Sequence, residues 1–234
     1  MKLILCGGGT GEQNAPANKK LNEIIDKTKP ILYIPLAMDE QDHPYDSCYE
    51  WITGELSMID VPYIEMVRTF EELSTKKLEN YTALFIGGGN AYKLLSGLKQ
   101  SGAFEAIKDY IQKDGIVIGG SAGAVIFGKD IDIISTMDEN EVGLEDTKGF
   151  DALSGISIFP HYMNMKSKLS EEENIARMNN FTEAIIEFSL KNGDVYAIPE
   201  EDAIFIDGNS VEVIGTRNYF FFKSGIRQEF EINS

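Results

Sequence analysis

The chain has 234 residues, a length that favours one large domain over residues 1–234 rather than two small ones. Its formal net charge of −17 at pH 7 argues against nucleic acid and anionic membranes as partners, and no apolar run is long enough to span a membrane. Its two cysteines, Cys6 and Cys48, form neither a disulfide framework nor a metal-binding spacing. The first apolar stretch is too short for the core of a signal peptide, so we expect a cytoplasmic protein.

The first half of the chain alternates short apolar runs with amphipathic segments. Buried strands are predicted at residues 2–6, 31–34, 63–67 and 81–86. Helices are predicted at about 18–27, from Pro44 through Leu56, around Tyr92 to Leu98, and at 102–113. Strand, loop and helix recurring in this way are typical of an α/β fold with a mostly parallel sheet flanked by helices on both faces.

A glycine-rich loop, GGGTG at residues 7–11, follows the first predicted strand. It lacks the G-x-G-x-x-G spacing of a dinucleotide site, and no helix is expected to open there because Pro16 and polar residues follow. We therefore expect a tight loop beside the active cleft rather than a nucleotide site.

Residues 116–128, IVIGGSAGAVIFG, have the pattern of an apolar strand, a sharp turn and a helix, with Ser121 at the turn. Side chains larger than glycine two positions from Ser121 would collide with a neighbouring strand or helix. The pattern is typical of a nucleophile elbow, which exposes the serine hydroxyl and points the amide of Ala122 at a bound oxyanion. The alternative is a glycine-rich turn with a serine helix cap.

A second glycine cluster, Gly87 to Gly89, follows the strand at 81–86 and is itself followed by Asn90. In a parallel sheet this loop lies at the same edge as Ser121. We expect an amide of Gly88 or Gly89 to complete an oxyanion hole with Ala122, and Asn90 to lie at the substrate. The alternative is a loop that only needs positive φ angles.

The second half is predicted to hold a strand at 131–135, an acidic irregular segment at 136–149, and a strand at 156–159 that ends at Pro160 and His161. Ser170 and Glu173 have the spacing of a capping box, which predicts a helix over 170–191. Its predicted core side consists of Ile175, Met178, Phe181, Ile185, Phe188 and Leu190. Short runs at the end of the chain predict an antiparallel extension of the main sheet, at 195–198, 203–206, 211–214, 219–222 and 228–232.

Ser121 needs a base, and the chain has two histidines that could serve. His161 directly follows a strand, at the edge where Ser121 emerges, whereas His43 precedes the helix that Pro44 opens. Position therefore favours His161. A carboxylate must orient the imidazole, and both Asp138 and Glu200 lie in loops near that edge.

Five ordered motifs together resemble the peptidase E family, which includes aspartyl dipeptidases and the related cyanophycinases. They are FIGGGNAYKLL at 85–95, GGSAGA at 119–124, GFDAL at 149–153, PHYMN at 160–164 and IPEEDAI at 198–204. The resemblance implies a flavodoxin-like or class I glutamine amidotransferase-like sheet and serine peptidase chemistry without a cofactor.

Carried over to this chain, the resemblance implies that Ser121 is the nucleophile and His161 the base. The orienting acid has been placed in the family both at a loop aspartate, which Asp138 matches, and at the glutamate of a PE motif, which Glu200 matches; we prefer Asp138. Aspartyl dipeptidases of this family have in common arginines that follow the histidine motif. Here Arg177 stands in that segment among several glutamates, which weakens the case for a preference for N-terminal aspartate.

The sequence thus predicts a serine exopeptidase that cleaves dipeptides or short peptides through an acyl-enzyme, with no metal and no cofactor. One alternative is an amidase or esterase that uses the same serine. Another is a binding or regulatory protein that keeps the fold without turnover. The oligomeric state stays open, and a homodimer is compatible with the sequence.

Overall fold

The computed structural model describes residues 1–232, and its centre is a seven-stranded sheet of order β3-β2-β4-β5-β1-β8-β9. The strands are β1 (Lys2–Cys6), β2 (Ile31–Ile34), β3 (Ile64–Met66), β4 (Ala83–Ile86), β5 (Ile116–Gly120), β8 (Ala203–Asp207) and β9 (Ser210–Ile214). β1 to β5 run parallel, β8 is antiparallel to β1, and β9 is antiparallel to β8. The mostly parallel α/β sheet is confirmed.

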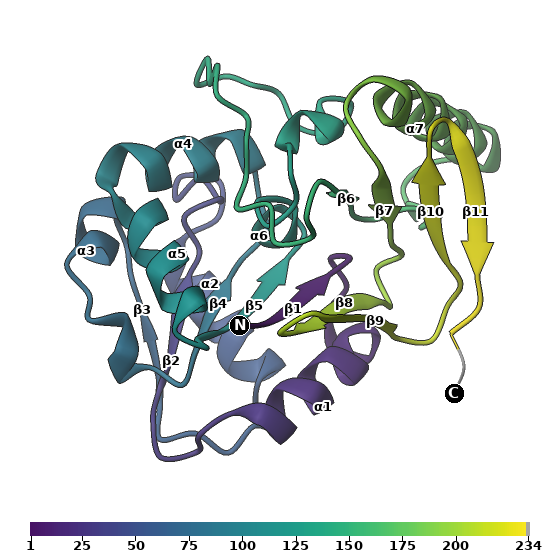
Figure 1. Cartoon of the computed structure of the whole chain (residues 1–234). Coiled ribbons are helices and arrows are strands. Elements are labelled where there is room, and N and C mark those ends of the chain that lie inside the picture. The colour runs from purple at the N-terminus through teal and green to yellow at the C-terminus, as the bar shows by residue number, and fades with distance from the viewer. Residues whose placement is uncertain (233–234) are drawn as a thin grey trace.

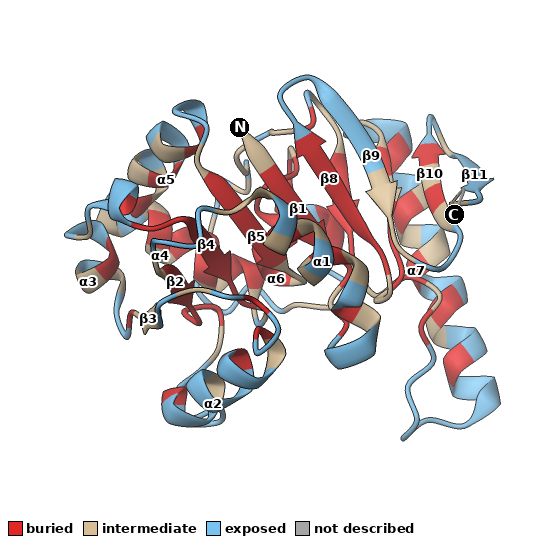
Figure 2. Cartoon of the chain, turned by 90° about the horizontal axis from the view of Figure 1, so that it is seen from below, coloured by how far each residue is buried: buried red, intermediate tan, exposed pale blue. Residues whose placement is uncertain are grey.

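Helices cover both faces of this sheet (Figure 1). α1 (Ala15–Ile24) and α2 (Tyr45–Glu55) pack on the face that carries Tyr33 and Phe85. The opposite face is covered by α3 (Phe70–Ser74), α4 (Ala91–Ser101), α5 (Ala103–Gln112) and α6 (Ala122–Val125). The strands β1, β2, β4, β5 and β8 are largely buried, whereas the edge strands β3 and β9 are half-buried or exposed and the outer sides of the helices are exposed (Figure 2). None of the helices described between residues 1 and 232 is long and apolar enough to cross a membrane.

A second, four-stranded sheet of order β11-β10-β7-β6 lies beside the first. It consists of β6 (Ser157–Phe159), β7 (Val195–Ala197), β10 (Tyr219–Lys223) and β11 (Ile226–Phe230), with α7 (Glu171–Lys191) packed against it. The prediction that the whole tail extends the main sheet is therefore wrong. Only β8 and β9 do so, because β7 pairs in parallel with β6 and antiparallel with β10.

Two local predictions are also corrected. The predicted strand at 131–135 is a 3₁₀ helix, η3 (Ile131–Ile134), whose start is capped by the side chain of Asp130. The loop after β1 does open into helix, as η1 (Gly11–Asn14) and then α1, with Pro16 at the second helical position. Proline is tolerated there because the first turn has no acceptor for its missing N–H. A further 3₁₀ turn, η2 (Leu78–Asn80), precedes β4.

The capping box of α7 is confirmed, since Ser170 Oγ accepts from the Glu173 amide at 3.2 Å and Glu173 Oε2 accepts from the Ser170 amide at 2.7 Å. Met178, Phe181, Ile185 and Phe188 are buried as predicted. Ile175 and Leu190 are instead 51% and 63% exposed. Asn174 is buried in the first turn of the helix in place of Ile175, and Leu190 lies beside Gly225 at the turn between β10 and β11.

Asp202, directly before β8, is a buried carboxyl that ties β8 to the chain between β9 and β10. Its side chain is 2% exposed. One oxygen accepts from the amides of Thr216 at 3.0 Å and Arg217 at 3.1 Å, and within residues 1–232 the other has no partner. Burial raises the pKa of Asp202 to about 6.

Replacing Asp202 with asparagine should therefore raise the free energy of unfolding at pH 7 by about 1 to 2 kcal/mol. The folded chain keeps the Asp202 proton up to about pH 6, whereas its unfolded pKa is 3.8, so the wild type loses stability as the pH rises between these values. Asparagine keeps the side-chain oxygen that accepts from the two amides, but it has no carboxyl group to ionise. Urea unfolding of the variant and the wild type at pH 4 and pH 7 checks this. An equal change in stability at both pH values, or no gain at pH 7, would contradict it.

Candidate active site

Ser121 lies in the sharp turn between β5 and α6, with φ 50° and ψ −111°. Its amide donates to the carbonyl of Cys6 at 3.1 Å, which fixes the turn to the end of β1. A Cβ on Gly119 would lie 2.3 Å from the carbonyl oxygen of Gly123, and a Cβ on Gly123 would lie 2.2 Å from that of Ile86. Glycine is required two positions on either side of Ser121, as the sequence predicts, and the hydroxyl is left exposed at the edge of the sheet.

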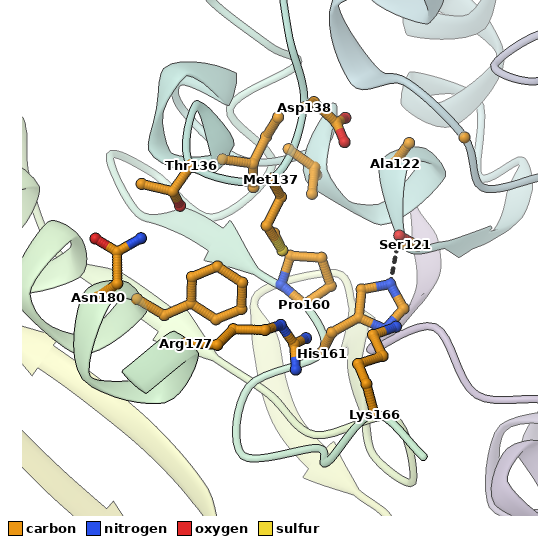
Figure 3. A pocket seen from close by; sticks show the side chains of 14 residues that line it. Ser121, Ala122, Thr136, Met137, Asp138, Pro160, His161, Lys166, Arg177 and Asn180 are labelled. Carbon is orange, nitrogen blue, oxygen red and sulfur yellow. Dashed lines mark hydrogen bonds between the residues drawn. The ribbon is translucent and has the colours of Figure 1, made fainter. Parts of the chain in front are cut away.

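His161 follows the end of β6, with φ 57°, and its amide donates to the carbonyl of Gly7 at 3.0 Å. Its Nε2 lies 2.8 Å from Ser121 Oγ (Figure 3). The structure thus brings together the serine and the histidine that the sequence selects. His43 instead lies just before α2, on the wall of a cavity that Ser121 and His161 also border.

Glu200 lies on the other side of the imidazole, with Oε1 2.8 Å from His161 Nδ1. Its Oε2 accepts from Gln13 Nε2 at 3.2 Å, and its amide donates to Asn164 Oδ1 at 2.8 Å. The hydrogen bond from His161 lowers the pKa of Glu200 despite its partial burial. An ionised carboxylate in this position fixes the imidazole with its Nε2 directed at Ser121.

The preference for Asp138 as the carboxylate partner of His161 is corrected by this geometry. Asp138 Oδ2 accepts from the amide of Ala91 at 2.7 Å, at the start of α4. The physical reason lies in the second sheet: β6 and β7 are parallel neighbours, so His161 and Glu200, which follow them, emerge side by side. Asp138 follows a 3₁₀ helix rather than a strand of that sheet. Burial raises the pKa of its carboxyl.

The glycine-rich loop after β1 forms the surface on which His161 and Glu200 rest. A Cβ on Gly8 would lie 2.2 Å from His161 Cε1 and 2.7 Å from Nε2. The amide of Gly9 donates to the carbonyl of Glu200 at 3.2 Å, and a Cβ on Gly9 would lie 2.3 Å from the same oxygen. The loop therefore lies beside the cleft, as predicted, and its glycines are needed because the imidazole and the backbone at Glu200 approach it closely.

Gly8→Ala should displace the imidazole and lower kcat by on the order of 10²-fold, since a misplacement of about 1 Å in a catalytic group has that effect. Gly11→Ala is the matched control in the same loop, because it also has a positive φ but nothing lies within 4 Å of its added Cβ. Steady-state kinetics of both variants decide the matter. Equal losses in the two would mean that backbone strain, not contact with His161, is responsible.

Backbone amides lie next to Ser121 at the loop after β4. A Cβ on Gly88 would lie 3.3 Å from Ser121 Cβ. The amides of Gly88, Gly89 and Ala122 have no acceptor within the described residues, 1–232. Asn90, predicted at the substrate, is occupied within the protein: its side chain accepts from the Lys93 amide at 2.9 Å and donates to the Glu139 carbonyl at 2.8 Å. It caps α4.

A pocket of about 570 Å³ opens at Ser121 and His161 (Figure 3). Asp138 lies at one end of it in this view and Arg177 and Lys166 at the other. The Arg177 guanidinium lies 4.8 Å from the centre of the Phe181 ring and donates to the carbonyl of Asn164 at 3.0 Å. The pocket therefore offers both a carboxylate and cations to a charged ligand.

Sequence reasoning missed two residues that hold Glu200, namely Gln13 and Asn164. Asn164 Nδ2 also donates to Glu201 Oε2 at 3.0 Å, so one amide side chain braces both glutamates. Asn164 lies three residues after His161, within the PHYMN motif, so the sequence could have marked it as a residue of the site. Gln13 stands in an unremarkable polar stretch, and only the fold brings it to Glu200.

The sequence model of peptidase family S51 matches residues 3–214. The chain belongs to peptidase family S51. Peptidase E of Pasteurella multocida (strain Pm70) is 27% identical over 202 residues, which cover 85% of this chain and 80% of that protein. The uncharacterized peptidase Lmo0363 of Listeria monocytogenes is 34% identical over 139 residues, or 58% of this chain and 62% of that protein.

Solved structures agree with this family. A candidate peptidase E protein from Listeria monocytogenes EGD-e has a TM-score of 0.68 and 25% identity, covering 91% of this chain and 96% of that one. A peptidase from an acI-B1 Actinobacterium, at 15% identity, shows the same fold with a TM-score of 0.72 over 100% and 95% of the two chains. The S51 member described here is a serine-type peptidase, which favours the enzyme over the non-catalytic alternative.

Proposed function

We propose that this peptidase is a serine exopeptidase that hydrolyses dipeptides or short peptides through an acyl-enzyme. The observation that carries the proposal is the continuous relay from Ser121 Oγ to His161 Nε2 and from His161 Nδ1 to Glu200, with both contacts at 2.8 Å. A serine hydroxyl near neutral pH is a weak nucleophile without such a base, and the base needs an oriented, ionised partner.

In the proposed reaction Ser121 Oγ attacks the carbonyl carbon of the scissile bond while His161 Nε2 takes its proton. The amides of Ala122 and of Gly88 or Gly89 stabilise the resulting oxyanion. The carbon–nitrogen bond then breaks as His161 returns the proton to the leaving amine. Water repeats the sequence on the ester and releases the acid, with His161 again accepting and returning one proton.

The charged pocket supports cleavage next to the amino end of the peptide. Asp138 is a half-buried carboxylate that accepts from the Ala91 amide, and it lines the same pocket as Ser121 and Ala122. An α-ammonium group is two bonds from the scissile carbonyl in an N-terminal residue, so a nearby carboxylate would hold it. Arg177 gives an aspartate side chain an ion partner, although its guanidinium also interacts with Glu200 and the Asn164 carbonyl.

Blocking the amino group tests this assignment. N-acetylation of a good dipeptide substrate should lower kcat/KM by about 10²-fold or more, because it removes the charge that Asp138 would pair with. Asp138→Asn should raise KM for free dipeptides by about tenfold.

Glu139→Gln is the control for Asp138→Asn, since it neutralises the neighbouring exposed acid. Hydrolysis of acetylated and free peptides at equal rates would refute exopeptidase specificity while leaving the serine mechanism standing. Hydrolysis of simple esters or amides but of no peptide would instead favour the esterase or amidase alternative.

A further inference from the structure

Ser121 stands between two cavities of different chemistry. The first is the charged pocket described above, which contains Asp138, Lys166 and Arg177. The second, of about 620 Å³, is bounded by the loops after β1 and β4 and by α2. Ser121 and His161 line both, so a peptide bond held at Ser121 borders both cavities.

Aromatic rings form the wall of the second cavity. Tyr33 and Phe85 project from β2 and β4 with ring centres 5.7 Å apart, and Trp51 of α2 lies 6.4 Å and 6.1 Å from them. Tyr33 and Phe85 are almost completely buried, whereas Trp51 remains 39% exposed although it packs against both. Trp51, Met38 and Cys48 all line the cavity.

The charges around this aromatic cavity also differ from those of the first pocket. Within the described chain neither lysine nor arginine lines it, and its charged lining residue is Asp42, which stands beside His43. A charged side chain placed there would lose hydration without gaining an ion partner. A large apolar side chain would instead remove its own surface and that of the rings from water.

We propose that the aromatic cavity is the subsite for the residue on the leaving-group side of the scissile bond and that it selects a large apolar or aromatic side chain. The assignment of side rests on the proposed function: with the N-terminal residue in the charged pocket at Asp138, the next residue extends into the opposite cavity. His161 borders that cavity and returns its proton to the nitrogen of this residue.

Matched dipeptides that share an N-terminal aspartate or alanine and end in phenylalanine, leucine, alanine or lysine test the subsite. We expect kcat/KM for phenylalanine to exceed that for alanine by about tenfold or more, with lysine at or below alanine. Trp51→Ala should reduce the phenylalanine-to-alanine ratio by about tenfold. Cys48→Phe, which fills the cavity, should shift the preference toward alanine.

Tyr49→Ala is the control, because Tyr49 lies on α2 with 38% exposure but does not line the cavity. The same dipeptides are titrated into Ser121→Ala by calorimetry, with and without Trp51→Ala, so that selection is measured whether or not cleavage occurs. No cleavage together with a binding preference for phenylalanine would overturn the proposed function and support the subsite. Equal binding of the phenylalanine and alanine peptides, or a ratio insensitive to Trp51 and Cys48, would overturn the subsite.

Discussion

Ser121→Ala should lower kcat for peptide hydrolysis by about 10³- to 10⁶-fold, while substrate binding stays within a fewfold of wild type. The hydroxyl is the atom that His161 Nε2 contacts at 2.8 Å, and alanine leaves the imidazole with no group to deprotonate. Ser121 has φ 50°, and alanine carries the same Cβ as serine, so we expect the backbone strain at this turn to stay the same. Steady-state kinetics and urea unfolding of the same preparation measure the two parts of this prediction.

Ser167→Ala is the control for Ser121→Ala, because Ser167 is an exposed serine in the loop after His161. It should be as active as wild type. A Ser121→Ala enzyme with wild-type turnover and an unchanged fold would remove Ser121 from the mechanism.

Glu200→Gln should lower kcat by up to about 10⁴-fold, the loss seen when the acid of a serine triad becomes an amide. Glutamine preserves the shape of the side chain but cannot stabilise the imidazolium that forms when Ser121 gives up its proton. Its amide group can also donate to Nδ1 and so favour the wrong tautomer. The hydrogen bond from His161, which lowers the pKa of Glu200, shows that the site prefers the charged carboxylate.

Two neighbouring acids serve as controls for Glu200→Gln. Glu201 accepts from Asn164 and lies 3.5 Å from Arg217, so Glu201→Gln should alter stability slightly and kcat little. Asp138→Asn should act mainly on KM. A larger loss of kcat in Asp138→Asn than in Glu200→Gln would reverse the assignment of the orienting acid.

The position of Ser121 and His161 could be predicted because each directly follows an apolar strand. β5 and β6 belong to different sheets, but the residues that follow them are both tied to the end of β1. The Ser121 amide donates to the Cys6 carbonyl at 3.1 Å, and the His161 amide donates to the Gly7 carbonyl at 3.0 Å. The glycines at 119 and 123 mark the turn by sterics alone. Those local rules do not distinguish Asp138 from Glu200, since both stand in acidic loops. The choice depends on the parallel pairing of β6 with β7, which no short pattern encodes.

The remaining errors have the same origin. Short, continuously apolar runs such as 195–198 and 219–222 fit either of the two sheets, and only tertiary packing assigns them to one. Ile131, Ile133 and Ile134 are apolar and β-branched like the residues of a strand. They are nevertheless buried in one 3₁₀ turn, whose start is capped by the Asp130 side chain. Local composition therefore predicted which segments are apolar and buried, but it did not predict which strands pair with one another.

We expect the hydroxyl of Ser121, activated by His161, to form a covalent bond to the substrate. The most direct test is mass spectrometry of the folded protein after treatment with a fluorophosphonate. We expect a single adduct, on the peptide that contains Ser121. It should be absent from Ser121→Ala and should form much more slowly in Glu200→Gln. A folded protein that takes up no adduct, or one modified at another residue while Ser121 stays free, would contradict it.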